Sequence, residues 1–417
     1  MDYEEINNNQ GVNMKSLRVV FYAINGTGLG HITRLNNIAE DAAILCERLG
    51  IKPTFEFLTT SDAPSVVSKF ITTKLPSKTT IRQLGLPVRS TTAAVKSQII
   101  SFMTGARADC IVLDTNPKGS YGEFPFLRDL ARTSVFIDRE KKSDVIDSSF
   151  KKHVKLFDSV IVPESQCAIV SDLFHPNMVY SGKIHSFKPE KSYSRKDSKE
   201  FFGASSKTLI YLSSGGGGDP QSESQLMEWI NILTNKLPLA KIIVGYGPLY
   251  KGTIDYSRDN VIPYTNTNIN QFFPGFDFAV SAAGYNTFEE LKAARCPGFF
   301  YALEKGMDDQ LQRIETLSKQ QLCGLVDLTQ KEQSLNVFLS QLDVIKEQLS
   351  KQPYESGSVY AAAQVLKTAL SKRDIFIPDF AIDNQVNELI KQRIKSLNNL
   401  KAIDAAQGQL CTLKAKA

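Results

Sequence analysis

The sequence of 417 residues predicts two successive α/β domains, each built around a parallel sheet. Three observations predict this fold class. Short apolar runs such as Cys110–Leu113 and Val160–Val162 are continuously hydrophobic, which is typical of strands covered by helices on both faces. Helical stretches separate these runs, so strand and helix alternate. A charged, serine-rich segment, Phe187–Ser206, interrupts the alternation near the middle of the chain, and the same pattern then starts again.

The first half of the chain predicts an arm and one domain. Residues 1–16 are polar and rich in asparagine, and we expect them to form a flexible arm ahead of a first domain at residues 17–190. The expected strands are Arg18–Asn25, Phe55–Thr60, Asp109–Asp114, Ser134–Asp138 and Ser159–Pro163. The expected helices are His31–Leu49, Thr92–Thr104, Glu123–Ala131 and Val145–Leu156.

The second half repeats the pattern after a linker at residues 191–206. Residues 207–350 predict the second domain, and residues 351–417 predict C-terminal helices and a tail. The expected strands are Thr208–Leu212, Lys241–Val244, Val261–Tyr264, Phe278–Ser281, Gly298–Leu303 and Gly324–Leu328. The expected helices are Gln221–Leu237, Thr287–Arg295, Asp309–Gln320 and Leu335–Leu349, followed by Val359–Ser371 and Val386–Leu397 in the C-terminal part.

Composition excludes several classes of protein. The 49 Lys and Arg residues against 44 Asp and Glu give a net charge of +5, which is too small and too scattered to favour nucleic-acid binding. No apolar run approaches the ~18 residues of a membrane-spanning helix, and the polar N-terminus does not resemble a secretory signal. The six cysteines have no regular spacing, so we expect reduced thiols in a cytoplasmic protein. They are Cys46, Cys110, Cys167, Cys296, Cys323 and Cys411.

A glycine-rich turn follows the first expected strand and leads into a helix. In Asn25–His31, glycines such as Gly28 and Gly30 permit close approach of a ligand to the backbone, and the helix N-terminus attracts anions. The turn is not a dinucleotide fingerprint, because the third glycine of that motif would stand where the sequence has His31. Packing alone could explain the glycines, but a histidine here stands where open α/β sheets bind ligands.

A second glycine cluster opens the second domain. Ser214 and the run Gly215–Gly218 lie between an apolar strand and a helix, where a flexible linker would be out of place. Each of four consecutive glycines costs roughly 0.5–1 kcal/mol in backbone entropy on folding relative to alanine. A functional reason for this cost is a nest of main-chain amides around a phosphate, which we prefer to the flexible linker as the interpretation.

Two further segments follow later strands. In Ser281–Leu291, Glu290 is either a carboxylate that accepts both hydroxyls of a ribose or, with Glu289, a complement to the helix dipole. The loop Glu304–Gln310 is polar, and on its own it is best explained as a solvated connection.

Together these segments resemble the GT-B glycosyltransferases of the MurG type, glycosyltransferase family 28. That family has a glycine turn with histidine in the acceptor domain, then a glycine loop, an S-x-A-G-x-x-T-x-x-E segment with a following A-x-x-x-P, and a D-x-Q-like loop. The resemblance covers roughly residues 17–370, and Asn25 and Leu29 depart from the family form of the first turn. The matching residues of the second domain are Ser281, Ala283, Gly284, Thr287, Glu290, Ala293, Pro297, Asp308 and Gln310.

The resemblance implies two Rossmann-like domains that face each other across a cleft, and an inverting transfer from a nucleoside diphosphate sugar, UDP-linked by the family default, without a metal or other cofactor. Glu290 would bind the ribose, Gln310 with Asp309 the donor sugar, and main-chain amides the diphosphate. Those amides are at Gly215, Gly216, Gly217, Gly218, Ala283 and Gly284.

The base that deprotonates the acceptor is expected in the first domain. We favour His31, since an imidazole titrates near neutral pH. Asp114, which ends a strand, could act as the base itself, orient His31, or simply cap a turn. Glu123, at the start of the next helix, is expected to cap it or to contact the acceptor.

Two other functions stay open at this stage. One is a nucleotide-sugar 2-epimerase of the same fold, and the other is a non-catalytic partner protein that binds a nucleotide sugar and assembles through its C-terminal helix. The acceptor, whether a glycan, a lipid carrier or a small metabolite, cannot be deduced. The apolar run Ile99–Met103 could contact the inner face of a membrane, but a helix packed on the sheet explains it better.

Overall fold

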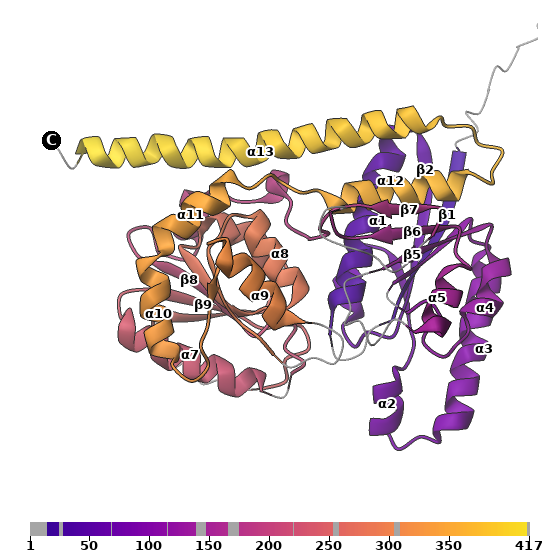
Figure 1. Cartoon of the computed structure of the whole chain (residues 1–417), viewed down its shortest axis with the longest axis horizontal. Helices are drawn as coiled ribbons and strands as arrows, with labels where there is room; N and C mark the ends of the chain where they lie inside the picture. The colour runs from indigo at the N-terminus through magenta and orange to yellow at the C-terminus, as the bar shows by residue number, and fades with distance from the viewer. Residues whose placement is uncertain are drawn as a thin grey trace, which may run out of the picture.

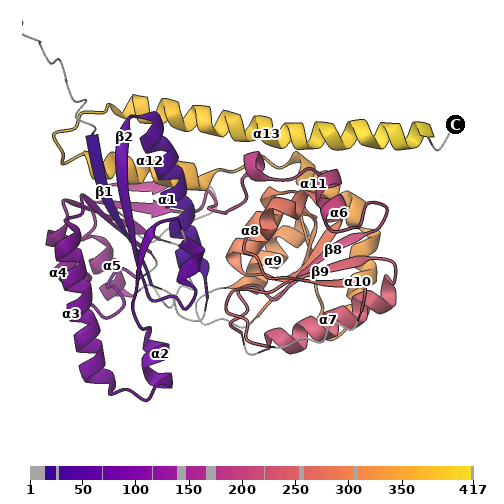
Figure 2. The same ribbon diagram turned by 180° about the vertical axis from the view of Figure 1, so that it is seen from behind.

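The computed structural model describes residues 15–24, 28–67, 69–114, 116–138, 147–165, 175–219, 221–252, 258–303 and 309–414. These residues form two parallel sheets with interleaved helices (Figures 1 and 2), which confirms the predicted fold class. The arm predicted at residues 1–16 lies outside the described residues up to position 14, and its last two residues belong to the first strand.

The first sheet has the order β3-β2-β1-β4-β5-β6-β7, and the second has the order β10-β9-β8-β11-β12-β13. In each sheet the chain leaves the central strand in one direction and returns to its other side, so β1 lies beside β4 and β8 lies beside β11. Such a reversal opens a crevice at the carboxyl ends of the two strands, where open α/β sheets bind ligands. The strands of the first sheet are β1 (Lys15–Ala23), β2 (Ile51–Thr59), β3 (Ile71–Lys74), β4 (Cys110–Asp114), β5 (Thr133–Ile137), β6 (Ser159–Val162) and β7 (Met178–Tyr180). Those of the second are β8 (Leu209–Ser213), β9 (Lys241–Gly245), β10 (Val261–Tyr264), β11 (Phe278–Ala282), β12 (Gly298–Tyr301) and β13 (Gly324–Leu325).

Alternate residues of the central strands enter different cores, because successive side chains of a strand point to opposite faces. In β1, Val19 and Phe21 pack against α1 and α12, whereas Val20 and Tyr22 pack against α3, α4 and α5. The second sheet is covered in the same way by α7, α10 and α11 on one face and by α8 on the other. The helices of the first half are α1 (Gly30–Arg48), α2 (Lys78–Gln83), α3 (Val88–Ala106), α4 (Phe124–Leu127) and α5 (Ser148–Val154). Those of the second half are α6 (Arg195–Phe201), α7 (Ser222–Lys236), α8 (Tyr285–Ala293), α9 (Gln310–Lys319), α10 (Lys331–Ser340), α11 (Leu342–Lys351), α12 (Gly357–Leu370) and α13 (Asp379–Lys414).

The segment predicted as a linker is largely structured, which corrects the sequence prediction. Helix α6 occupies much of residues 191–206, and Ser194 caps it by accepting a hydrogen bond from the Asp197 amide. Phe202, directly after the helix, is buried in the core of the second domain. The helix buries little else, so its exposed charged residues give the segment a linker-like composition.

Other elements also differ from the prediction. The edge strands β3 and β7 were missed because they are four and three residues long and only partly buried. The helix expected at Leu335–Leu349 is two helices, α10 and α11, that meet at Gln341. The apolar spacing continues across this break, so the pattern could not reveal it.

The C-terminal helices join the two domains. Helix α12 returns to the first domain and packs in the core beside α1. Helix α13 then runs along both domains (Figures 1 and 2): Val386 and Leu389 pack on the first core and Leu397 on the second. The sequence predicted a helix only over Val386–Leu397, whereas α13 extends beyond this range at both ends.

The sequence led us to expect no membrane-spanning helix and reduced cysteines. Within them, we find no helix with the length and apolar character needed to cross a membrane. The four cysteines whose side chains are described, at positions 46, 110, 296 and 323, are buried and form no disulfide. Burial raises the pKa of each of these thiols, so they are held in the protonated form.

Candidate active site

A cavity of about 700 Å³ lies between the two domains, at the carboxyl ends of the central strands. Its two glycine turns face each other, since a Cβ built on Gly216 would lie 3.8 Å from the Leu29 side chain. Most of the residues predicted from the sequence line this cavity, although they come from segments far apart in the chain. They are Gly28, Gly30, His31, Ser214, Gly215, Gly216, Gly217, Gly218, Gly284, Thr287, Glu290 and Gln310.

His31 lies in the first turn of α1 and is paired with a carboxylate behind it. Its Nδ1 is 3.5 Å from Oδ1 of Asp114, the last residue of β4, which is fully buried. Arg34, one helical turn after His31, places its Nη1 3.0 Å and 3.3 Å from the two oxygens of the same carboxylate. The buried guanidinium balances the charge of Asp114, and the carboxylate in turn orients the imidazole, so that Nδ1 faces the protein and Nε2 lies on the opposite side of the ring.

The glycine loop after β8 needs its glycines for the backbone path. Gly215 and Gly217 have φ angles of 82° and 77°, in the left-handed region that side chains other than glycine rarely adopt. A Cβ on Gly217 would lie 2.7 Å from the backbone nitrogen of Tyr250, and one on Gly247 would overlap the carbonyl group of Gly216. The loop is therefore pressed against the turn at 247–250, and it lines the cavity just ahead of the N-terminus of α7.

The N-terminus of α8 is the second helix start at the cavity. Gly284 occupies its N-cap position and provides no side chain to bond the first-turn amides. Tyr285, Asn286 and Thr287, the first three residues of the helix, line the cavity. Since the first N–H groups of a helix have no partner within the helix, this end carries partial positive charge that favours an anion.

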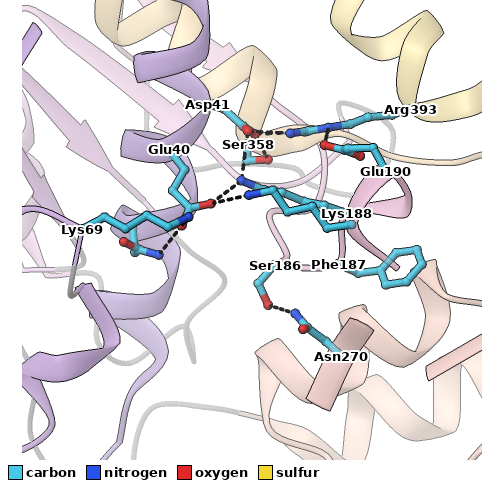
Figure 3. A network of polar contacts seen from close by, with 12 residues as sticks. Glu40, Asp41, Lys69, Ser186, Phe187, Lys188, Glu190, Asn270, Ser358 and Arg393 are labelled. Carbon is cyan, nitrogen blue, oxygen red and sulfur yellow. Dashed lines mark hydrogen bonds and ion pairs between the residues drawn. The ribbon is translucent and has the colours of Figure 1, made fainter. Parts of the chain in front are cut away.

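Glu290, one turn further along α8, is a carboxylate of the second domain that lines the cavity. Burial raises its pKa from 4.5 to about 7, although a hydrogen bond from the Ser186 hydroxyl lowers it in part. The Ser186 oxygen in turn accepts a hydrogen bond of 2.8 Å from Asn270 (Figure 3). A carboxylate that is partly desolvated and not paired with a cation is expensive for stability, which is typical of a binding or catalytic group.

The neighbouring Glu289 has the opposite environment. It is buried away from the cavity, and its oxygens lie 2.8 Å from Lys292 and 3.9 Å from Lys183. Burial alone would raise the pKa of Glu289, but these two lysines lower it. Of the adjacent glutamates, only Glu290 reaches the cavity.

Three of the predicted residues lie behind or away from the cavity wall. Asp114 contacts it only through His31, as described above. Asp309 caps α9 by accepting a hydrogen bond from the Gln312 amide at 3.1 Å, whereas Gln310 reaches the cavity and accepts one from the Leu303 amide at 2.9 Å. Ala283 is buried, and its carbonyl accepts a hydrogen bond from Arg313. Asp308, part of the loop pattern that suggested a sugar site, lies outside the described residues, as do Asn25, Gly26 and Thr27.

Glu123 is also outside the cavity and has a structural environment. It is fully buried and accepts hydrogen bonds from the Tyr22 hydroxyl at 2.6 Å and from the amides of Ser120 and Tyr121 at 2.8 Å and 2.6 Å. With its oxygens satisfied by these donors, the carboxylate organises the loop before α4. The structure does not bring it to the same place as His31.

A charged wall of the cavity was missed by the sequence reasoning (Figure 3). Lys188 lies 2.6 Å from Glu40 and 3.2 Å from Asp41, and Lys69 lies 2.9 Å from Glu40. Burial alone would raise the pKa of Glu40, but Lys188 and Lys69 lower it to about 2. No local pattern marks these residues, because their charges resemble those of any solvated helix or loop.

The same network continues to the C-terminal helix. Arg393 of α13 is buried and binds both oxygens of Asp41, at 2.6 Å and 3.0 Å, as well as Glu190 at 3.1 Å (Figure 3). Ser358 of α12 donates a further hydrogen bond to Asp41 at 2.6 Å. Helices α1, α12 and α13 and the segment between the domains thus meet around one buried carboxylate.

Arg34 and Tyr285 connect the two halves of the site. The Arg34 guanidinium carbon lies 5.1 Å from the centre of the Tyr285 ring, in a cation–π contact. The Tyr285 hydroxyl donates to the carbonyl of Pro163 at 3.4 Å and accepts from the amide of Ile184 at 3.3 Å. The start of α8 is therefore attached both to the first domain and to the residue that holds Asp114.

Among the residues that the structure describes, no group of three or more His, Cys, Asp or Glu side chains is arranged to hold a metal ion.

Comparison with known proteins supports the architecture. No family model and no curated protein matches the sequence. Among solved structures, the chain is similar to the calicheamicin glycosyltransferase, with 11% identity and a TM-score of 0.59 over 87% of this chain and 100% of that one. It is similar to MurG of Acinetobacter baumannii, with 14% identity and a TM-score of 0.54 over 84% and 99%. A putative UDP-N-acetylglucosamine 2-epimerase from Listeria monocytogenes matches with 11% identity and a TM-score of 0.56 over 88% and 99%. At such identities the likeness concerns the fold, and the chain has the two-domain GT-B fold that the sequence predicts.

Proposed function

We propose that this chain is an inverting glycosyltransferase that moves a hexose or an N-acetylhexosamine from a nucleoside diphosphate sugar, preferably UDP-linked, to an acceptor hydroxyl. The observation that carries the proposal is that His31, backed by Asp114, and Glu290 open onto one cavity from opposite domains. The solved structures that share the fold include two glycosyltransferases, which supports the same reaction class.

The donor would occupy the second-domain side of the cavity. Glu290 would accept the ribose hydroxyls, in place of the Ser186 hydroxyl that it binds here. The glycine loop before α7 and the uncapped start of α8 would surround the diphosphate with main-chain N–H groups and the positive ends of two helices. Gln310 would contact the sugar. We expect this arrangement to neutralise the leaving diphosphate without a metal ion.

His31 would act on the acceptor from the first-domain side. Its Nε2 takes the proton of the acceptor hydroxyl as that oxygen bonds to the anomeric carbon, and the bond from this carbon to the diphosphate oxygen breaks. Because attack and departure occur on opposite faces, the anomeric configuration inverts. Asp114 stabilises the imidazolium that forms, as the carboxylate does in other His–Asp pairs. The proton then passes to solvent, and the nucleoside diphosphate leaves.

The test combines binding with turnover. Purified protein is incubated with a panel of UDP- and dTDP-sugars, and the released nucleoside diphosphate is measured with water as the acceptor. We expect release from at least one donor, its loss in His31→Gln with unchanged binding of the nucleoside diphosphate, and weakened binding in Glu290→Ala. Normal release by His31→Gln would remove the proposed base.

The same incubation distinguishes the proposed glycosyltransferase from a 2-epimerase, the alternative for which the likeness to the Listeria structure is an argument. An epimerase would convert the sugar of the donor to its 2-epimer without any acceptor. Recovery of the unchanged sugar would exclude that alternative, and binding with neither release nor isomerisation would indicate a non-catalytic partner protein.

A further inference from the structure

A further cavity lies beneath α13 on the second domain, between Arg295, Lys346 and Leu397, and we call it the α13 pocket. Its wall is built by α6, α11 and α13 together with the segments that precede β11 and β12. Figure 2 shows α6, α11 and α13 on one side of this domain. The pocket therefore lies at the amino ends of these two strands, whereas the candidate active site lies at their carboxyl ends.

The guanidinium of Arg295, which lines this pocket, is only partly satisfied within the described chain. The residue follows the end of α8, and its Nη2 donates a hydrogen bond of 3.1 Å to the Gln352 carbonyl. Its Nη1 is buried and has no hydrogen-bond partner among the residues that the structure describes. Burial lowers the pKa of Arg295, and no acidic group of the described chain offsets this effect. Because a partly desolvated cation without an anion is costly, the pocket is suited to an anion from outside the chain.

Two further cations line the α13 pocket, Arg195 of α6 and Lys346 of α11. Arg195 forms an ion pair with Asp277, a carboxylate that Lys199 shares at 2.8 Å. Lys346 lies 3.9 Å from Asp343, but that carboxylate is fully exposed, so water screens the pair. Among the described residues that line the pocket, three are cationic and none is acidic.

The rest of the lining is apolar. Leu397 and Leu400, one turn apart on α13, cover the pocket, and its wall includes Pro274, Ala294 and Pro297. Leu397 also packs in the core of the second domain, so this side of the pocket is anchored. The cavity volume of about 170 Å³ is slightly larger than the ~150 Å³ at which an apolar cavity holds one benzene molecule. The pocket therefore has room for one group of that size.

We propose that the α13 pocket binds a small phosphate monoester with an apolar body about the size of a benzene ring, independently of the activity proposed above. The guanidinium of Arg295 would donate to the phosphate oxygens, while the ring lies against Leu397 and Leu400. Charge complementarity selects a phosphate, since the four cations in and beside the lining exceed the two carboxylates near them by two charges. A phosphate monoester is close to a dianion at neutral pH. Because the two leucines belong to α13, the ligand would also add contacts between this helix and the second domain.

The α13 pocket is distinct from the apolar run Ile99–Met103, where the sequence left a contact with a membrane open. Ile99 and Met103 are buried in the core on one face of the first sheet, and Ile100 and Phe102 pack against the same core. Packing on the sheet therefore explains this run, as the sequence favoured.

The experiment is isothermal titration calorimetry of the full chain with phenyl phosphate at neutral pH, without UDP and with saturating UDP. We expect a site that UDP does not displace, because the α13 pocket and the candidate active site lie at opposite ends of the strands. Inorganic phosphate lacks the ring and should bind about ten-fold or more weakly. Benzyl alcohol lacks the charge and should not bind, and benzoate, with a single charge, should bind more weakly than phenyl phosphate.

Arg295→Gln should weaken the binding of phenyl phosphate about ten-fold or more through the loss of charge-assisted hydrogen bonds, and Lys346→Gln should weaken it to a lesser extent. The matched control is Lys351→Gln, which removes a lysine of the same helix that lies outside the pocket and should leave binding unchanged. Thermal unfolding of each variant checks that it folds, and the partly exposed Lys346 provides a test even if Arg295→Gln is unstable.

Four results would overturn the proposal: no binding of phenyl phosphate, its displacement by UDP, equal binding of any of the three comparison compounds, or wild-type binding by either cation variant. None of them depends on turnover, so a failure here is distinct from a failure of the proposed reaction.

Discussion

Glu290→Gln is expected to make the unliganded protein more stable above neutral pH while weakening its binding of nucleotides. Glutamine keeps the shape of the side chain and removes its charge. In the folded protein, burial raises the pKa of Glu290 from 4.5 to about 7. The folded state therefore holds a proton that the unfolded chain releases, and the stability of the wild type falls as pH rises from about 4.5 to about 7.

The size of the effect follows from the same shift. At 1.36 kcal/mol per pKa unit, burial of the ionised Glu290 costs roughly 3 kcal/mol above pH 7 and nothing well below pH 4.5. With about 2–4 °C per kcal/mol for a domain of this size, the variant should melt several degrees higher than the wild type at about pH 8. At about pH 4 the difference should nearly disappear, since the carboxyl is then mostly protonated in both the folded and the unfolded wild type.

The assay is thermal unfolding of both proteins at the two pH values, repeated with saturating UDP. UDP should raise the melting temperature of the wild type more than that of Glu290→Gln, because the amide replaces one of the two acceptor oxygens with a donor. Glu289→Gln is the matched control on the same helix. It breaks buried ion pairs with Lys292 and Lys183, so it should lower stability by about 3–5 kcal/mol near neutral pH. Equal melting temperatures of Glu290→Gln and wild type at about pH 8 would refute the reasoning.

Four further substitutions test other parts of the structure. His31→Gln should lower the turnover number by about 10²–10⁴-fold with an unchanged dissociation constant for the nucleoside diphosphate by calorimetry, and a loss of binding would instead make His31 a donor ligand. Gly217→Ala, at a φ of 77° and with a Cβ 2.7 Å from a backbone nitrogen, should destabilise the second domain by about 1–3 kcal/mol in thermal unfolding. Gly284→Ala, whose Cβ meets nothing within 4 Å, should cost much less, and equal losses would contradict the geometry of the glycine loop. Arg393→Met leaves the buried Asp41 with Lys188 as its remaining cation and should cost about 3–5 kcal/mol in denaturant unfolding, whereas a neutral result would mean that α13 does not hold the domains together.

The parts of the fold that the sequence predicts are those where local pattern and burial agree. Continuously apolar runs such as Cys110–Leu113 are fully buried strands, and the alternation of strands and helices gives both sheets. The pattern fails where burial is slight. Helix α6 has a highly charged sequence because only one face of it packs against the protein, and β3 has no apolar run because it is an edge strand. Hydrogen bonds, rather than hydrophobic periodicity, define both elements.

The candidate site likewise contains residues that the sequence predicts and residues that it does not. Glycines with positive φ and a histidine at a helix start leave a signal in the sequence, because few residues can occupy such positions. Buried charges such as Arg34 and Lys188 leave none, since only the approach of another segment distinguishes them from solvated ones. Glu123 shows the converse: a polar residue at a promising place in the sequence is used entirely to organise its own loop.

The link between Arg34 and Tyr285 explains why the two halves of the site cannot be understood separately. Arg34 holds Asp114, which orients His31, and its guanidinium also lies over the ring of the first residue of α8. Arg34 thus contacts both the carboxylate behind the proposed base and the first residue of the helix at the proposed diphosphate site. A rotation of the domains that moved α8 away would remove the aromatic face from Arg34 and leave its charge to Asp114 alone. The group of His31, Asp114 and Arg34 lies within the first domain, and the contact of Arg34 with Tyr285 joins this group to the start of α8.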